Sequence, residues 1–215
     1  KVDDLPRDAE LAWASSPCTD LSLAGTRAGL AGVQSGTFWH FTKLLRELEG
    51  DRPEAVVLEN VVGLATSHGG DDLTAAIREF NDLGYSVDVL AIDARRFLPQ
   101  SRPRLFLVGA QNPPEDVAEP NSELRPDWLQ WVYGDKTLRT HRAKLPAPPA
   151  PKTEGLGEVV EEMSLNDERW WDADRTEAFT SSLSPMQRDR VMALKRSPGV
   201  KYRTAYRRTR NGVAV

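Results

Sequence analysis

One short apolar run constrains the fold most: Ala55-Val56-Val57-Leu58, which lacks the alternation of a half-buried strand. Such a run predicts a strand that is buried on both faces, as in the centre of a parallel sheet. Apolar residues at helical spacing lie on either side of it and predict helices over 37–48 and 71–83. Further strands are expected over residues 11–14, 85–92 and 104–110. Strands that alternate with helices predict a doubly wound α/β sheet.

The composition changes after residue 111, so that three parts are predicted. Residues 1–111 hold the alternating strands and helices. Residues 112–153 end in HRAKLPAPPAPKT, which is rich in proline and alanine and typical of a semi-rigid extended linker. Residues 154–215 are expected to form a separate C-terminal segment.

This C-terminal segment ends in a basic stretch, although the whole chain carries a formal net charge of −4. A helix is predicted over 185–197, with Ser184 as its cap and Pro185 at its first position. From Pro185 to Val215, nine Lys or Arg residues stand against one acid, Asp189. A basic end on an acidic body is either a phosphate-contacting surface or a solvated tail, and charge alone leaves both open.

The composition excludes several classes of protein. The chain has one cysteine, so it forms no internal disulfide, which suits a reducing cytoplasm. One cysteine and three histidines also exclude a zinc site of the usual Cys/His spacing, and no metal is expected. No stretch approaches the ~18 apolar residues that a membrane span needs, so no membrane association is predicted.

Two predicted strands end in residues that can carry chemistry. The strand over 11–14 leads into Pro17-Cys18, and the strand over 55–58 leads into Glu59-Asn60. Reactive groups in an open α/β sheet gather beyond the carboxyl ends of its strands. A thiol and a carboxylate at neighbouring strand ends could serve as nucleophile and proton donor. The alternatives are a cysteine buried as a small apolar residue and a glutamate that caps the next helix.

Three segments, in this order, resemble the motifs of the DNA cytosine-5 methyltransferases. They are SSPCTDLSLAG at 15–25, LENVVGL at 58–64 and FLPQSRPRLFLVG at 97–109. The spacing also fits, with about 41 residues from Cys18 to Glu59 and about 41 more to Gln100. The resemblance covers roughly residues 3–111. It implies a partial Rossmann-like, S-adenosylmethionine-dependent methyltransferase sheet, with a C-terminal extension toward a target-recognition region.

The resemblance implies a covalent mechanism on a cytosine that has left the duplex. Cys18 would add to carbon 6 of the ring, and a methyl group from S-adenosylmethionine would then go to carbon 5. Because a free thiol titrates near ~8.5, the site must favour the thiolate by positive charge or helix dipoles. Glu59 would hold the exocyclic amine and the protonated ring nitrogen 3.

Further residues receive roles from the same resemblance. Arg104 would contact the base carbonyl, and Arg102 would order the loop and Glu59. Pro17 and Phe38 would contact the cofactor. Nucleic-acid contacts, with double-stranded DNA as the partner, are expected at Thr19, Ser22, Ser35, Gln100, Arg203, Arg207 and Arg208.

The sequence departs from the family pattern at three places. Thr19 stands where the family usually has glutamine, and Ser15-Ser16 replace the usual Gly-Phe. No aromatic-x-Gly-x-Gly cofactor loop precedes Cys18. That loop is therefore expected from a second chain, from residues outside 1–215 or from a split-gene partner. Without it, residues 1–215 should bind cofactor poorly, and the strand that ends at Trp13 should expose an edge and an apolar face.

Two other functions remain open at this point. A tRNA cytosine-5 methyltransferase would share the fold and the three motifs, and a truncated relative would bind nucleic acid without catalysis. A cytoplasmic protein of bacterial or phage-like origin, in a restriction-modification or phage-defence system, is the expected setting.

Overall fold

The computed structural model describes residues 5–16, 29–32, 36–117, 123–153, 155–164 and 166–198, and the backbone of 209–210 and 213–214. The chain divides into two compact units, residues 1–152 and residues 153–215. Each is described by itself.

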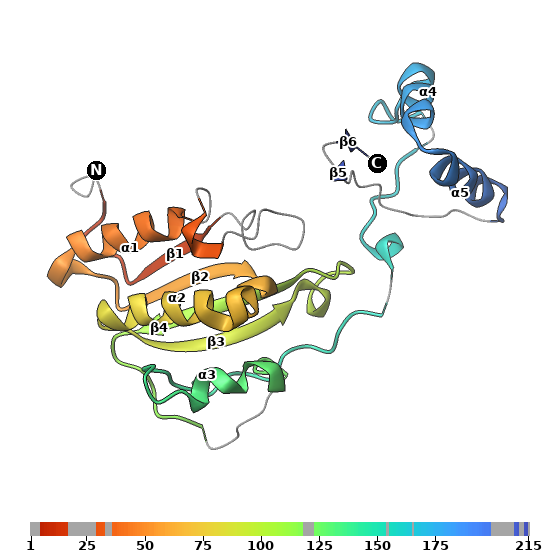
Figure 1. Ribbon diagram of the computed structural model, residues 1–215. Coiled ribbons are helices and arrows are strands. Elements are labelled where there is room, and N and C mark those ends of the chain that lie inside the picture. The colour runs from red at the N-terminus through yellow and green to blue at the C-terminus, as the bar shows by residue number, and fades with distance from the viewer. Residues whose placement is uncertain are drawn as a thin grey trace. The chain divides into compact units, whose positions relative to one another are not determined.

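The first unit is built on a four-stranded sheet (Figure 1). Its strands are β1 (Leu11–Ser15), β2 (Ala55–Val61), β3 (Ser86–Asp93) and β4 (Pro103–Ala110). They lie in the order β1-β2-β4-β3, with β1 parallel to β2 and β4 antiparallel to both of its neighbours. The α/β class is confirmed, but the sheet is mixed. The short connection over 94–102 explains this, because a parallel crossover needs a dozen or more residues.

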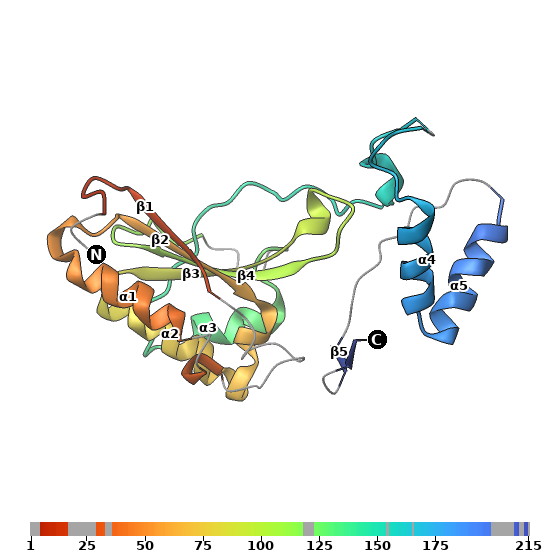
Figure 2. The same ribbon diagram turned by 90° about the horizontal axis from the view of Figure 1, so that it is seen from above.

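Two helices cover one face of this sheet. They are α1 (Thr37–Glu47) and α2 (Asp71–Asp82), close to the predicted ranges, and Figures 1 and 2 show both on the same side of the strands. Their apolar stripes bury Phe38, Leu45, Ile77 and Phe80 against the sheet. On the outermost strand, β1, Leu11 and Trp13 are 52% and 58% exposed, so an apolar edge is accessible there as expected.

Short 3-10 turns complete the connections between these elements. In the two units they are Gly29–Ala31, Glu49–Asp51, Val62–Ala65, Ser67–Gly70, Ala94–Arg96, Asp127–Leu129 and Leu156–Glu158.

The stretch expected to be a linker is in part packed onto the sheet. It contains α3 (Gln130–Gly134), which lies beside β3 in Figure 1. Arg125 forms a buried ion pair with Asp88 of β3, and the Tyr133 hydroxyl donates to Asp88 Oδ1 at 2.8 Å. Residues 112–152 therefore belong to the first unit, and the one boundary, at Lys152–Thr153, lies one residue from the expected start of the C-terminal segment, with no division at residue 111.

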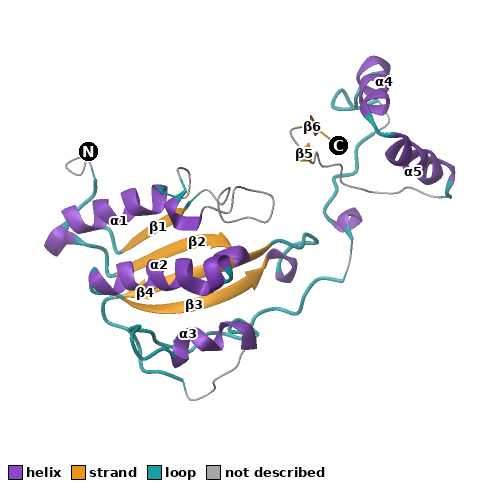
Figure 3. Ribbon diagram, viewed as in Figure 1, coloured by secondary structure: helices purple, strands orange, loops and turns teal. Residues whose placement is uncertain are grey.

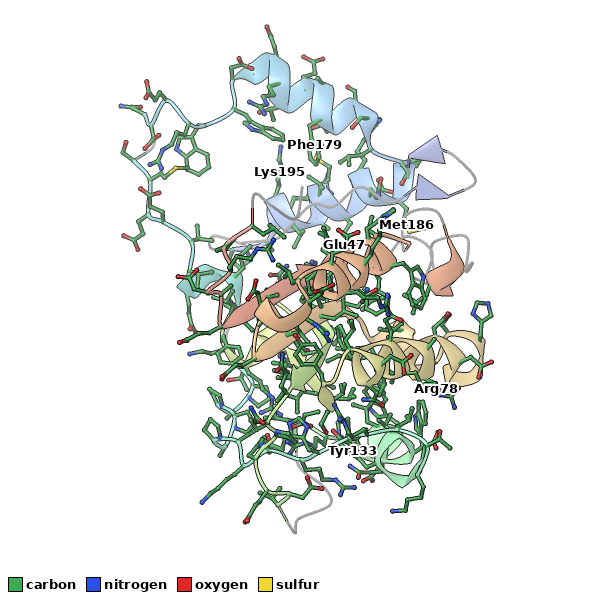
Figure 4. All side chains as sticks on the ribbon, turned by 90° about the vertical axis from the view of Figure 1, so that its left-hand side faces the viewer. Glu47, Arg78, Tyr133, Phe179, Met186 and Lys195 are labelled. Carbon is green, nitrogen blue, oxygen red and sulfur yellow. The ribbon has the colours of Figure 1, made fainter. Side chains whose placement is uncertain are left out.

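The second unit consists of helices and a small strand pair (Figure 3). Its elements are α4 (Ala173–Ser182), α5 (Pro185–Arg196), β5 (Thr209–Arg210) and β6 (Val213–Ala214), the last two antiparallel. Ser184 and Gln187 form a capping box at the start of α5, with Pro185 at its first position, as predicted. Phe179 of α4, labelled in Figure 4, packs edge-on against Trp171. None of the described side chains in this unit is buried.

Candidate active site

The described part of the site centres on Glu59, near the carboxyl end of β2. Its Oε1 lies 2.8 Å from Arg104 Nε, and the two side chains are 19% and 18% exposed. In the antiparallel pairing of β2 with β4, Glu59 stands opposite Phe106, two residues from Arg104. Because side chains alternate along a strand, Glu59 and Arg104 project from the same face of the sheet. The carboxylate is thus fixed by a partly buried guanidinium.

The other carboxylate oxygen of Glu59 is held from β1. The Ser15 hydroxyl donates a hydrogen bond to Glu59 Oε2. Ser15 and Glu59 are also backbone partners in the parallel pairing of β1 with β2. Both oxygens of the carboxylate therefore have a partner on a neighbouring strand.

Asn60 makes the corresponding contact on the other face of β2. Its side chain is buried, and its Nδ2 donates to Ser16 Oγ at 2.8 Å. Its Oδ1 accepts from the backbone N–H of Val61 at 2.8 Å, so both ends of the amide are satisfied. Ser16 directly precedes Pro17-Cys18 in the sequence. The structure thus places the start of the Pro-Cys segment against the end of β2.

Several predicted site residues lie outside the described part of the chain. They are Pro17, Cys18, Thr19, Ser22, Ser35, Arg203, Arg207 and Arg208. Their roles stay predictions, and so does the convergence of the Cys18 sulfur and the Glu59 carboxylate on one base.

Asp93 organises the loop that carries Gln100 and Arg102. Its carboxylate accepts from the backbone N–H groups of Arg95 and Arg102, at 3.0 Å and 2.6 Å, and from the Ser101 hydroxyl at 3.0 Å. Desolvation works against the charged form, but these hydrogen bonds outweigh it and hold the pKa of Asp93 below its ordinary value. Asp93 therefore fixes the loop as an anion.

The two arginines of this segment are placed differently from what was expected. Arg102 and Gln100 have exposed side chains, and Arg102 joins the Asp93 network through its backbone N–H. The guanidinium that contacts Glu59 belongs to Arg104, although that contact was expected of Arg102. The reason is the strand register, which puts Arg104 diagonally across from Glu59.

Phe38 is a core residue in this structure. Its side chain is fully buried in α1, with ring centroids 5.7 Å from Phe80 and 5.0 Å from Trp39. A fully buried ring offers no surface to a bound molecule. The place of Phe38 in the apolar stripe of α1 accounts for its burial, and the expected contact with the cofactor stays a prediction.

Sequence reasoning missed Ser15, Ser16, Asn60 and Asp93. A signal was available for the first three, because parallel strands over 11–15 and 55–59 bring two hydroxyls beside a Glu-Asn pair.

No group of three His, Cys, Asp or Glu that could hold a metal occurs among the described residues. None of the described helices is long and apolar enough to cross a membrane.

The chain was compared with known proteins. The family model for C-5 cytosine-specific DNA methylase matches residues 1–209. A Type II methyltransferase of Bacillus sp. (strain RFL6), M.Bsp6I, is 32% identical over 114 residues, which is 52% of this chain and 35% of the relative. M.BanI of Aneurinibacillus aneurinilyticus is 35% identical over 97 residues, 45% of this chain and 22% of the relative.

Among solved structures, the Entamoeba histolytica methyltransferase EhMeth matches with 15% identity and a TM-score of 0.42, over 57% of this chain and 41% of that one. The chain spans about a third or less of the length of the two curated relatives. Because the family model matches nearly the whole sequence, the chain belongs to the C-5 cytosine-specific DNA methylase family.

Proposed function

We propose that this chain carries the base-reacting residues of a DNA cytosine-5 methyltransferase, with Cys18 as the nucleophile. One observation carries the proposal: the Glu59 carboxylate is fixed by Arg104 and Ser15 at the end of β2. The neighbouring β1 ends at Ser15, two residues before Pro17-Cys18. The sequence therefore brings a thiol within a few residues of an oriented carboxylate.

The arrangement of Glu59 suits the edge of a cytosine. A carboxylate has about four lone-pair positions, two on each oxygen. Arg104 occupies one position on Oε1 and Ser15 one on Oε2. One position on each oxygen remains for two donors, which matches the exocyclic amine and the protonated ring nitrogen 3. Charge drawn from the ring at these two atoms favours attack of the Cys18 thiolate on carbon 6.

Arg104 has a second proposed role beside its contact with Glu59. Its Nε is used by Glu59, and the rest of the guanidinium fork carries further donors. One of these is proposed to hold the carbonyl oxygen of the base. Arg102 and Gln100, with exposed side chains on the loop ordered by Asp93, are proposed to contact the nucleic acid.

S-adenosylmethionine is the proposed methyl donor, and when bound it supplies an electrophilic methyl group on a sulfonium. The described residues fit it only in part, because Phe38 is buried and offers it no surface. β1 is the outermost strand of the described sheet and exposes the side chains of Leu11 and Trp13 on one face, which favours a further element that covers this face beside the edge. We place the cofactor loop on that element, supplied by a second chain or by residues outside 1–215.

The second unit is proposed to be the beginning of a target-recognition region. Its helix α5 presents Arg188, Arg190, Lys195 and Arg196 as exposed cations. These, together with the basic residues after 200, are proposed to contact DNA phosphates. The relatives that the chain matches are Type II methyltransferases. A bacterial restriction-modification system is accordingly the proposed setting.

Covalent trapping tests this function. The protein, together with the second chain or the residues outside 1–215 that supply the cofactor loop, is incubated with S-adenosylmethionine and with DNA synthesised from 5-fluorocytosine, whose carbon-5 fluorine cannot leave as a proton does. A denaturation-resistant adduct is expected with the native chain and none with Cys18→Ser. An equal adduct in the Ser variant would exclude Cys18 as the nucleophile. Trapping on 5-fluorocytosine-containing tRNA but not on DNA would favour the tRNA-methylating alternative.

A further inference from the structure

We propose that Ser15 and Ser16 are positioning residues, which lock the end of β1 to the end of β2 and thereby set the Pro-Cys segment relative to Glu59. This inference rests on the proposed function. It assigns a task to two residues that do not themselves touch the base, and it is carried by side-chain contacts on two faces of the sheet.

The first contact fixes the rotation of the Glu59 carboxylate. Arg104 alone holds one oxygen and leaves the group free to turn about that contact. The Ser15 hydroxyl holds the other oxygen, and the backbone register sets Ser15 directly beside Glu59. With both oxygens engaged, the two remaining lone pairs point in fixed directions. A hydrogen bond of this kind, to an ionised group, is among the stronger ones in proteins.

The second contact fixes the first residue of the Pro-Cys segment. Asn60 is 2% exposed, and a buried amide without a partner is strongly unfavourable. Its Nδ2 finds that partner in Ser16 Oγ at 2.8 Å, while its Oδ1 is held by the Val61 N–H. Asn60 therefore cannot swing away without losing a hydrogen bond. Ser16 is tied to the carboxyl end of β2, one residue before Pro17.

The two contacts act on opposite faces because neighbouring side chains of a strand alternate. Ser15 reaches Glu59 on one face, and Ser16 reaches Asn60 on the other. The chain is pinned from both sides at the point where it leaves the sheet toward Cys18. A lateral shift of that point would break at least one of the two bonds, which is the property that a positioning pair needs.

Four variants test the proposal in the trapping and methylation assays. Ser15→Ala and Ser16→Ala each remove one hydroxyl, and Ser15→Thr keeps it on an exposed strand position that tolerates a methyl group. Thr66→Ala is the matched control, since its exposed hydroxyl donates to the backbone oxygen of Gly63. The DNA is unmethylated plasmid for turnover and 5-fluorocytosine DNA for trapping.

Loss of either hydroxyl should lower kcat about 10- to 100-fold, the effect of losing a hydrogen bond to a charged or buried group. KM for DNA should stay within two-fold, and Ser15→Thr should keep most of the rate. The melting temperature should change little in Ser15→Ala and fall in Ser16→Ala, which leaves the buried Asn60 amide without its partner. A merely structural role would instead lower the melting temperature and the amount of active protein, with kcat per active site unchanged. Native rates in both Ala variants would overturn the proposal.

A second measurement needs neither DNA nor methyl donor. Cys18 is the one cysteine of the chain, so alkylation by iodoacetamide reports on it alone. Ser16→Ala should change the alkylation rate at least three-fold, and Thr66→Ala should leave it unchanged. If even the native protein traps no DNA, the proposed function fails, while the alkylation rates still decide whether Ser16 positions the segment. Equal alkylation in all variants overturns the positioning role by itself.

Discussion

At the scale of single residues, the ion pair of Glu59 with Arg104 combines a structural contact with a proposed chemical task. Both side chains are about four-fifths buried, so forming the pair has a cost in desolvation free energy. The strand register keeps the geometry of the pair. A neutral amide at position 59 keeps the shape but accepts on one side only. The electrostatic effect that the Glu59 carboxylate is proposed to have on the base is therefore lost.

We expect Glu59→Gln to lower the rate of methyl transfer by about 10²- to 10⁴-fold, the usual range for a general acid or base. Single-turnover methylation of plasmid DNA measures it. Glu79→Gln is the matched control, because Glu79 also forms an ion pair with an arginine, Arg46, at 2.9 Å, between α2 and α1. A loss of equal size in both variants would show that only stability was affected.

His141 gives the first unit a stability that depends on pH. The ring is 4% exposed, with Nδ1 3.1 Å from Ser86 Oγ. Burial lowers the pKa of His141, against the opposing effect of Asp88 and Asp116. Because the folded state binds the proton less readily than the unfolded state, stability is complete above a pH of about 6.5 and is lost as the pH falls toward the folded-state pKa.

Urea denaturation between pH 7.5 and pH 5.5 checks this. The free energy of unfolding should fall over that range in the native chain and fall less in His141→Gln. His40→Gln is the control, since His40 is exposed on α1. The same pH dependence in the His141 variant as in the native chain would contradict the assignment.

At the scale of elements, two arginines after β3 hold the proline-rich stretch. Arg95 Nε donates to Lys152 O at 3.0 Å, and Lys152 N donates back to Arg95 O at 2.7 Å. Arg96 donates to Pro149 O at 2.8 Å and pairs with Glu123. The last residues of the first unit are thereby attached to the same loop that Asp93 orders.

Replacing both arginines by alanine should free this stretch. We expect trypsin to cleave after Lys144 and Lys152 several-fold faster in the double variant, because a bound extended segment must detach before a protease can seat it. Mass spectrometry of the fragments measures the rates. Arg46→Ala, which breaks an ion pair between α1 and α2, should leave cleavage at these two lysines unchanged.

The elements also show how far the sequence predicts the fold. The stripes of α1 and α2 have a local period, β2 has a continuous apolar run, and each of the three elements was predicted within a few residues. Strand direction leaves no such local pattern, so β4 was predicted as a strand but its antiparallel direction was not. The packing of residues 112–152 rests on the buried pair of Asp88 and Arg125, which are far apart in the sequence. Local composition therefore indicated a linker there.

The candidate site divides in the same way. Glu59 and Arg104 were predicted as site residues because they lie in the motif segments 58–64 and 97–109. Their mutual contact depends on strand register, which the motifs do not give. Ser15 and Ser16 were noticed only as departures from a pattern. Their role depends on which strand lies beside β1.

At the scale of the whole molecule, charge is distributed unevenly along an acidic chain. The net charge is −4, yet the exposed cations of α5 lie close in sequence to further arginines after residue 200. Nucleic-acid binding by such a segment depends on release of counterions from phosphates, so its strength falls with salt. We expect the acidic remainder to repel phosphate, which would confine the proposed contact to the basic segment and the site.

Two pairs of substitutions test this division: Arg190→Ala with Lys195→Ala on α5, and Arg207→Ala with Arg208→Ala beyond the described residues. Each cation that contacts a phosphate contributes about one unit to the slope of log affinity against log salt. Each double variant should therefore flatten that slope by about two, with little change in methylation at saturating DNA.

Lys43→Ala on α1, whose partner is Glu47, should leave the slope unchanged. Fluorescence anisotropy of labelled DNA across a salt series measures it. A native slope in both double variants would mean that the basic segment is a solvated tail, and that the DNA is held by the first unit or by a partner.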